Sequence, residues 1–319
     1  MRTLILNSSN IVPNSNNSKL VFQFSGGGIT IKKGQKVALA SIQMYYSTFN
    51  ITAAQGNNVF NYVWFDGTTH QVLIPDGFYD ALGLNNYLRF EMIANNHYLI
   101  NSTTGAYVYF LGITTNSTFY SIQLDCFVMN TTLFPPASYS LPAGATWSIP
   151  NGAASPCPMF QILNNGFQYV VGFAVGFYPQ GNPQPPNPPA TVPYGTTVYA
   201  AAPTYAQTPA YTTNQAFISK DSGLVPQITP LSSYILTCSL VNNTYAVPNN
   251  LLYSFSPEGT FGSQFTVAPN QLVFVDANDG QYNFMELRFT DQNGFPVAIQ
   301  DPNYVILMVI SDKNEDIGL

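Results

Sequence analysis

Short segments rich in β-branched and aromatic residues recur along the chain, separated by clusters of Gly, Pro, Asn and Asp. Segments of this length and composition are typical of strands, and the clusters between them are typical of turns. The clearest predicted strands are residues 19–24, 36–44, 59–65, 106–113, 119–128 and 234–241. The pattern predicts an all-β fold, either a β-sandwich or a barrel.

The segment 283–290, NFMELRFT, shows strand alternation most plainly. Its apolar residues at alternate positions are Met285, Leu287 and Phe289. They share one face, so this strand is expected to be half buried. Asp279–Gly280 precedes the strand and Asn293–Gly294 follows it, and both dipeptides tolerate the positive φ of a tight hairpin. We therefore expect roughly the last fifty residues to form an antiparallel meander.

One segment departs from the β pattern. Its apolar residues recur at helical spacing, and they are Ala81, Leu84, Leu88 and Met92. Asp80 stands where a residue that caps a helix N-terminus is expected, and Asn95–Asn96 stands where the helix is expected to end. The sequence predicts one short amphipathic helix laid across the edge or end of a sheet.

The stretch from Cys126 to Ser219 contains no Asp, Glu, Lys, Arg or His, and residues 181–190 read GNPQPPNPPA. An uncharged, Pro-rich segment of this kind is typical of surface loops, because it cannot build a dense core alone. We expect residues 131–228 to form an insertion of long surface loops, with or without strands added to the core. The expected jelly-roll core then consists of residues 19–130 and 229–319, and residues 1–18 are expected to form an N-terminal arm.

The composition limits the class of function. Charged residues make up only 8% of the 319 residues, the formal net charge is -6, and the chain has 21 Tyr and 23 Phe. An acidic chain is a poor ligand for nucleic acid, because phosphates are bound by neutralising positive charge. The one basic cluster, Lys32, Lys33 and Lys36, surrounds Gly34 and is typical of a solvated turn.

Neither a membrane span nor a disulfide framework is expected. The longest apolar runs, residues 169–177 and 304–310, are too short to cross a bilayer, and the apolar stretch at the N-terminus is too short for a signal peptide. Cys126, Cys157 and Cys238 are odd in number and widely spaced, which fits neither disulfides nor a zinc site. We expect all three to be reduced and the chain to fold in a reducing compartment.

No catalytic, cofactor-binding or metal-binding residues are expected. His70 and His97 are the only histidines, and they flank the predicted helix in different contexts. Residues 276–280, DANDG, resemble a calcium loop, but the glycine is in the wrong register, so a hairpin turn is favoured. Gly26–Gly28 is followed by neither a Lys–Ser/Thr pair nor a helix, so a turn is favoured there too. The chain is therefore not expected to be an enzyme.

Four segments carry a resemblance to a known family. They are residues 72–88 (VLIPDGFYDALGLNNYL), 114–126 (TTNSTFYSIQLDC), 169–179 (YVVGFAVGFYP) and 289–313 (FTDQNGFPVAIQDPNYVILMVISDK). Their order, and the ending in which a D-x-x-G-x-P turn precedes D-P-N and a terminal strand, resemble the penton or minor capsid proteins of virophages and polinton-like viruses. The resemblance implies a single jelly roll of two sheets with about four strands each.

The resemblance also implies a role and partners. Proteins of this kind form homopentamers that fill the five-fold vertices of an icosahedral capsid and contact a double-jelly-roll major capsid protein, so this chain is expected in the virion. The arm is expected to reach neighbouring subunits or the shell interior, and residues 131–228 to face outward. Two alternatives stay open: another minor capsid or cement protein, and a viral attachment β-sandwich. The latter would bind a host receptor or glycan through residues 131–228. Aromatic pairs such as Tyr45–Tyr46 and Phe78–Tyr79 also suit sugar rings, but core packing is the favoured interpretation of these pairs.

Overall fold

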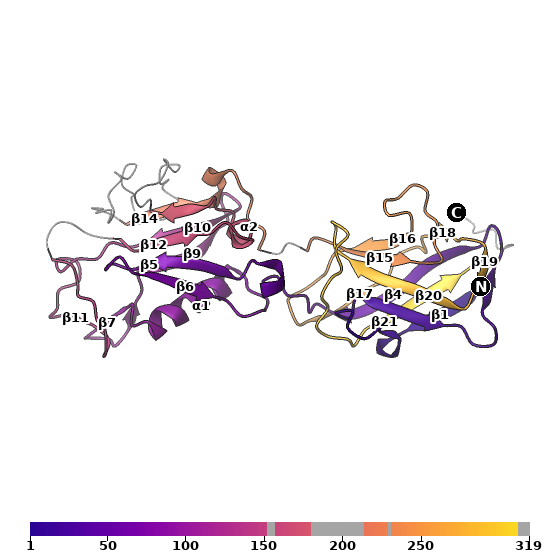
Figure 1. The fold of residues 1–319 in the computed structure, drawn as a ribbon, viewed down its shortest axis with the longest axis horizontal. Coiled ribbons are helices and arrows are strands. Elements are labelled where there is room, and N and C mark those ends of the chain that lie inside the picture. Colours follow the sequence, from indigo (N-terminus) through magenta and orange to yellow (C-terminus); the bar gives the residue numbers. More distant parts are fainter. Residues whose placement is uncertain (152–156, 180–213, 229–230, 312–319) are drawn as a thin grey trace. The chain divides into compact units, whose positions relative to one another are not determined.

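The computed structural model describes residues 1–151, 157–179, 214–228 and 231–311 of the chain. The chain divides into two compact units (Figure 1). Unit 1 consists of Met1–Phe49 and Leu231–Leu319, and unit 2 consists of Asn50–Pro230. Unit 2 is thus an insertion into a discontinuous unit 1.

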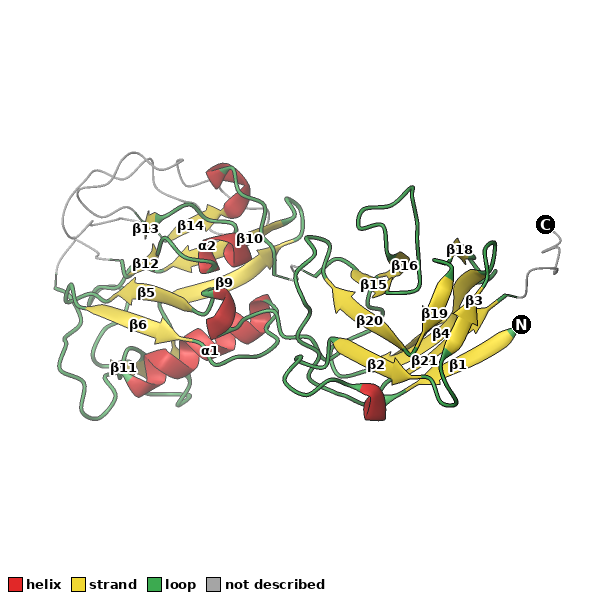
Figure 2. Ribbon diagram, turned by 45° about the vertical axis from the view of Figure 1, so that its right-hand side comes forward, coloured by secondary structure: helices red, strands yellow, loops and turns green. Residues whose placement is uncertain are grey.

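Unit 1 contains two antiparallel sheets of four principal strands. The first has the order β1 (Arg2–Leu6), β21 (Val305–Ile310), β4 (Lys36–Tyr45) and β17 (Gln264–Val267). The second has the order β16 (Leu251–Phe255), β15 (Tyr234–Cys238), β20 (Phe284–Thr290) and β2 (Lys19–Gln23). Short β18 (Val275–Asp276) pairs with β4, and β3 (Ile29–Ile31) pairs with β19 (Gly280–Tyr282). Figure 2 shows both sets of strands in yellow.

The connectivity of these eight strands is that of a jelly roll. Along the chain, successive principal strands alternate between the two sheets, and only β15 and β16 follow each other within one sheet. This alternation places the first strand beside the last, because β1 pairs with β21. Two Greek keys wound in this way define the fold, so the predicted jelly-roll sandwich is confirmed.

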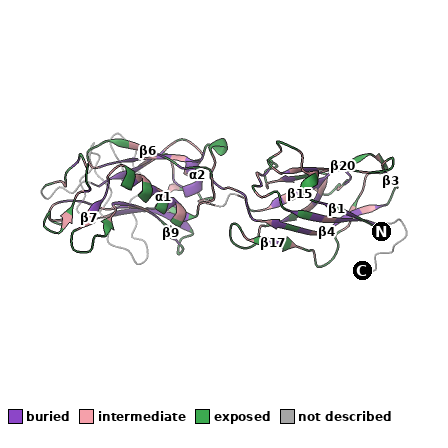
Figure 3. Cartoon of the chain, turned by 90° about the horizontal axis from the view of Figure 1, so that it is seen from below, coloured by how far each residue is buried: buried purple, intermediate pink, exposed green. Residues whose placement is uncertain are grey.

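Alternation within β20 fixes which side of the second sheet forms the core. Met285, Leu287 and Phe289 are fully buried, whereas Arg288 on the opposite face is exposed. Across the sheet, Leu287 is opposite Leu20 of β2. The half-buried strand predicted from the sequence is therefore confirmed, and its inner face contributes to the purple core of unit 1 in Figure 3.

The predicted C-terminal meander is wrong. β20 pairs with β15 and β2, whereas β21 pairs with β1 and β4 in the other sheet. Asp279–Gly280 is not a hairpin turn either, because it connects β18 to β19, which pair with different strands. The turn residues correctly mark where these strands end. In a jelly roll, however, β20 and the following β21 belong to different sheets.

The N-terminal residues are part of unit 1. The five residues of β1 pair with β21, and Leu4 and Leu6 are buried. The amide of Asn17 donates to the carbonyl of Ile299 at 2.7 Å. Residues 1–18 thus differ from the expected arm, because they supply the first jelly-roll strand.

Unit 2 is a second β-structure with its own core. One sheet has the order β13 (Gly176–Tyr178), β12 (Met159–Ile162), β5 (Val59–Val63) and β6 (Thr69–Leu73). The other has the order β14 (Gln215–Ile218), β10 (Ser121–Cys126) and β9 (Leu111–Asn116). A small sheet joins β11 (Tyr139–Ser140), β7 (Leu99–Asn101) and β8 (Tyr107–Val108). The helices are α1 (Ala81–Ala94) and α2 (Phe167–Val171), with 3-10 turns at Ser8–Asn10, Ala53–Gln55 and Ser219–Ser222 across the chain.

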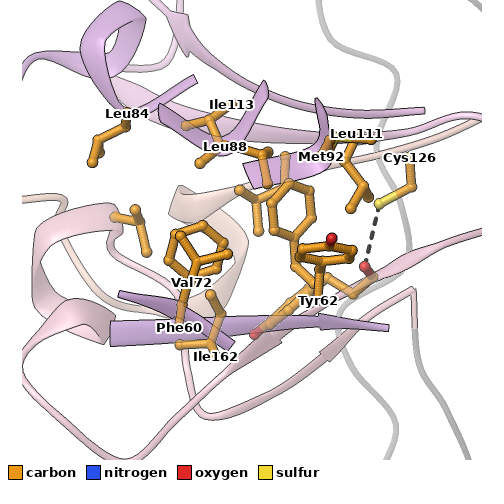
Figure 4. Close-up of a cluster of buried hydrophobic side chains, with 14 of the residues drawn as sticks. Phe60, Tyr62, Val72, Leu84, Leu88, Met92, Leu111, Ile113, Cys126 and Ile162 are labelled. Carbon is orange, nitrogen blue, oxygen red and sulfur yellow. Dashed lines mark hydrogen bonds between the residues drawn. The ribbon is translucent and has the colours of Figure 1, made fainter. Parts of the chain in front are cut away.

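Helix α1 confirms the prediction made from its spacing. The carboxylate of Asp80 accepts a hydrogen bond from the backbone N–H of Gly83 at 2.7 Å, and Asn95 ends the helix. The four residues at helical spacing are all buried, as predicted. Figure 4 shows Leu84, Leu88 and Met92 beside Ile113, facing Phe60 and Val72 across the core.

The division of the chain differs from the one expected from the sequence. The sequence predicts that residues 19–130 belong to the jelly roll, but β5, β6 and α1, which lie within that range, belong to unit 2. Phe60 of β5 packs on Phe167 of α2 with ring centroids 4.7 Å apart. The uncharged stretch 126–219 is therefore only the second half of the inserted unit, and its most biased part, 180–213, lies outside the described residues.

Candidate functional site

The possible calcium loop, the lysine cluster and the glycine run have structural roles in the described part of the chain. The described residues contain no cluster of three or more His, Cys, Asp or Glu that could hold a metal ion. The Lys36 Nζ lies 3.9 Å from Oδ1 of Asp276. Lys32 and Lys33 precede β4, in the turn that leads into it. Gly28 allows close backbone approach, since a Cβ there would meet the Tyr282 carbonyl oxygen at 2.5 Å.

The three cysteines are free, and all three are buried. Burial raises the pKa of the Cys126 thiol, and its neighbour Cys157 raises it further. Burial also raises the pKa of Cys238, to about 12. Thiols with raised pKa values are poor nucleophiles, because the thiolate is the reactive form. These side chains serve as core residues.

The two histidines do converge, which corrects the expectation that they occupy different contexts. His70 lies in β6, and His97 follows α1 at the entrance to β7. Their ring centroids are 4.5 Å apart, with the planes at 84°. No pattern in the sequence predicts this pairing, because 26 residues and a helix separate the two positions. Antiparallel pairing of β6 with β5 places His70 opposite Tyr62, and the Tyr62 hydroxyl is hydrogen-bonded to His97.

Aromatic rings enclose His97. The indole of Trp64 stacks on it with centroids 4.3 Å apart and planes 11° apart. The Tyr62 hydroxyl lies 2.8 Å from Nδ1 of His97. Trp147 meets Trp64 edge-on at 5.2 Å, and its indole N–H donates to the Asn96 carbonyl at 2.8 Å. Both tryptophans and both histidines of the chain therefore form one group, the His–Trp cluster, of Tyr62, Trp64, His70, His97 and Trp147.

The environment of the cluster disfavours positive charge. Burial lowers the pKa of His97 to about 4, and repulsion from His70 adds to this, although Asp66 opposes it. Burial also lowers the pKa of His70, again against the pull of Asp66. Nε2 of His70 lies 2.8 Å from the Thr68 hydroxyl, which donates to Asp66 at 2.5 Å. Both rings are therefore neutral at pH 7.

The exposed apolar side chains are the candidates for contacts with other molecules. On α1 of unit 2, Leu82, Phe90 and Ile93 point away from the core. In unit 1, the β15–β16 loop carries Tyr245 and Val247 at its tip, which are 100% and 98% exposed. Exposed apolar side chains indicate a contact surface where they lie together, so these two groups are the candidates.

Comparison with known proteins gives matches among solved structures only. No protein-family model matches the chain, and neither does any curated protein. The mavirus penton protein is similar over 97% of this chain and 98% of that chain, at 9% identity and a TM-score of 0.39. The cryo-EM structure of the Sputnik virophage is similar over 98% of this chain and 97% of that chain, at 12% identity and a TM-score of 0.36.

These neighbours are a penton protein and a virophage, the kinds of protein and virus named by the sequence resemblance. No helix among the described residues is long and apolar enough to cross a membrane.

Proposed function

We propose that this chain is a penton-type minor capsid protein that forms pentameric capsomers at the vertices of an icosahedral shell. The observation that carries the proposal is the eight-strand jelly roll of unit 1, which is a capsid-domain architecture. The four sequence segments that resemble pentons support it, since they lie in both units.

The surface chemistry suits repeated contacts between copies. Only 8% of residues are charged, so few charges would lose their hydration at an interface. Exposed aromatic side chains such as Tyr245 suit such contacts, because aromatic residues are enriched in interface cores. A ring of identical copies needs a heterologous interface whose rotation closes, and unit 1 is the part we assign to it.

In this proposal, the protein resides in the virion, at capsid vertices. Unit 1 contacts its own copies and a double-jelly-roll major capsid protein, and unit 2 faces outward. The buried reduced cysteines are compatible with assembly in a reducing compartment inside the host cell. Direct nucleic-acid binding is not part of the role, since the formal net charge is -6.

The first test is the solution mass of the purified chain, measured by light scattering over a concentration series. A mass near five times 34.9 kDa is expected. A chain that stays monomeric, both alone and after mixing with a double-jelly-roll major capsid protein, would contradict the proposal.

A glycan array with the same sample distinguishes a vertex protein from the alternative, an attachment domain that binds glycans. Trp147, the only Trp in residues 131–228, is buried, so sugar binding there would need other side chains such as the exposed Tyr169. Binding that is lost in Tyr169→Ala would favour attachment. Absence of glycan binding together with a pentameric mass is the result expected for a vertex protein.

A further inference from the structure

The His–Trp cluster holds three parts of unit 2 together. Tyr62 and Trp64 belong to β5 and the residue after it, and His97 belongs to the α1–β7 connection. Trp147 belongs to the loop between β11 and β12, and its bond to Asn96 attaches that loop to the same connection. A change in the cluster therefore acts on the end of α1 and on this loop at once.

The direction of the central hydrogen bond depends on the charge of His97. We assign the Tyr62 hydroxyl as the donor to Nδ1, because a neutral imidazole with its proton on Nε2 accepts there. Protonation places a hydrogen on Nδ1, so this nitrogen can only donate and the Tyr62 hydroxyl has to turn to accept from it. The buried ring, only 4% exposed, would then carry a positive charge in contact with the Trp64 indole.

Few groups can compensate that charge. The carboxylates that face the cluster are Asp66, in the β5–β6 turn, and Glu91 of α1, which acts on Tyr62. His70 would repel a charged His97 and is itself titratable. The loop that carries Trp147 contributes no charge, since residues 126–219 contain no ionisable acid, base or histidine.

A second observation is that one buried hydrogen-bond donor of the closed cluster lacks an acceptor in the described part of the chain. The buried indole N–H of Trp64 has no hydrogen-bond acceptor among the described residues. An unpaired buried donor favours any state in which it reaches water. Opening of the cluster would both hydrate this group and solvate a charged His97.

We propose that the His–Trp cluster is an acid-sensitive latch. Protonation of His97 releases Trp64 and Trp147 from each other and frees the α1–β7 connection with the Trp147 loop, while the jelly roll of unit 1 stays folded. The latch gives the inserted unit a second conformation in an acidic compartment, which goes beyond a structural role at a vertex.

The chain contains its own probe for this change. Both tryptophans lie in the cluster, so tryptophan emission reports changes in unit 2 at the latch and none in unit 1. Between pH 7.5 and 3.5 we expect a reversible red shift of the emission, with its midpoint between about pH 6.5 and 4. Hydrogen exchange should increase in residues 95–98 and around Trp147 over the same range, and stay unchanged in β4 and β21.

Three variants test the assignment. His97→Gln should abolish the transition, because the side chain cannot be charged. His70→Gln should move the midpoint to lower pH, because a like charge no longer opposes protonated His97 in the closed cluster, and Asp66→Asn should move it to higher pH, because the attraction that stabilises that charge is lost. If His97→Gln fails to fold, the opposite shifts of the pH midpoint in His70→Gln and Asp66→Asn still test the assignment.

Other results would overturn the latch. An emission that stays constant down to pH 4 would do so, as would a transition that His97→Gln leaves in place. Shifts in the same direction in His70→Gln and Asp66→Asn would also contradict it. Exchange that rises in β4 and β21 at the same pH would mean general acid unfolding instead.

Discussion

The hydroxyl groups of Thr48 and Tyr234 lie 2.5 Å apart in the interior of unit 1, although 186 positions separate them in the sequence. Thr48 lies just before the chain enters unit 2, and Tyr234 begins the first strand after it returns. This hydrogen bond joins the two ends of the insertion point, so the jelly roll closes there regardless of what is inserted.

Removing one partner of this bond should destabilise unit 1 specifically. In Tyr234→Phe, the Thr48 hydroxyl stays buried without its partner, and we expect the free energy of unfolding to fall by about 1–3 kcal/mol. Hydrogen exchange of β15 and β20 in urea should show the loss. Tryptophan fluorescence should show an unchanged transition, because both tryptophans lie in unit 2.

The Thr48→Val, Tyr234→Phe double variant is the control for that prediction. It removes both hydroxyls, so no buried group is left unpaired and the second substitution should cost less than the first. Strictly additive losses would show that the two hydroxyls do not interact in solution.

Unit 1 should fold without unit 2. Replacing residues 50–230 with a short Gly–Ser linker removes no strand of the jelly roll, since all eight principal strands lie outside that range. We expect a β-type circular dichroism spectrum and the same number of subunits as for the full chain by light scattering. A folded monomer would instead place the contacts between copies in unit 2.

Local features of this chain could be predicted from sequence, because they depend on neighbouring residues. The helix at 81–94, its Asp80 cap and the inner face of β20 all follow from spacing within a few positions. The predicted strand 106–113 is in fact split into β8 and β9. This break leaves Phe110 free to enter the core between Trp64 and Phe134.

Long-range features could not be predicted in the same way. Antiparallel pairing of β1 with β21, and the meeting of His70 with His97, depend on which strands become neighbours. Alternation specifies a face and not a partner. The uncharged composition after residue 126 also suggests a boundary between residues 130 and 131, whereas β5 pairs with β12 across that position to build one sheet.

The Asp80 cap should stabilise unit 2 measurably. Asp80→Ala leaves the N–H of Gly83 without its side-chain acceptor, and we expect a loss of about 1 kcal/mol. Urea unfolding followed by tryptophan fluorescence measures this loss. Asp80→Asn is the matched control, since Asn caps helices nearly as well, and equal losses in both variants would assign the effect to charge.

The stability of unit 2 should depend on pH through His97. Its folded pKa of about 4 lies below the ordinary value of about 6.5, so the unfolded state binds the proton more tightly. Stability is complete above about pH 6.5, falls as the pH decreases, and levels off near pH 4. The total loss is about 3 kcal/mol. Urea midpoints at several pH values should show this slope in the wild type and lose most of it in His97→Gln.

The tip of the β15–β16 loop should contribute to assembly and not to folding. Tyr245 and Val247 are almost completely exposed, so replacing both with Ser removes no buried contact within the chain. If this tip lies in the contact between copies, the double variant should lose the pentameric mass in light scattering and keep its melting temperature. Tyr120→Ser is the matched control, because it removes a 79% exposed aromatic side chain from unit 2. If the control loses the pentamer and the loop variant keeps it, the contact lies on unit 2, and the assignment of the ring to unit 1 is wrong.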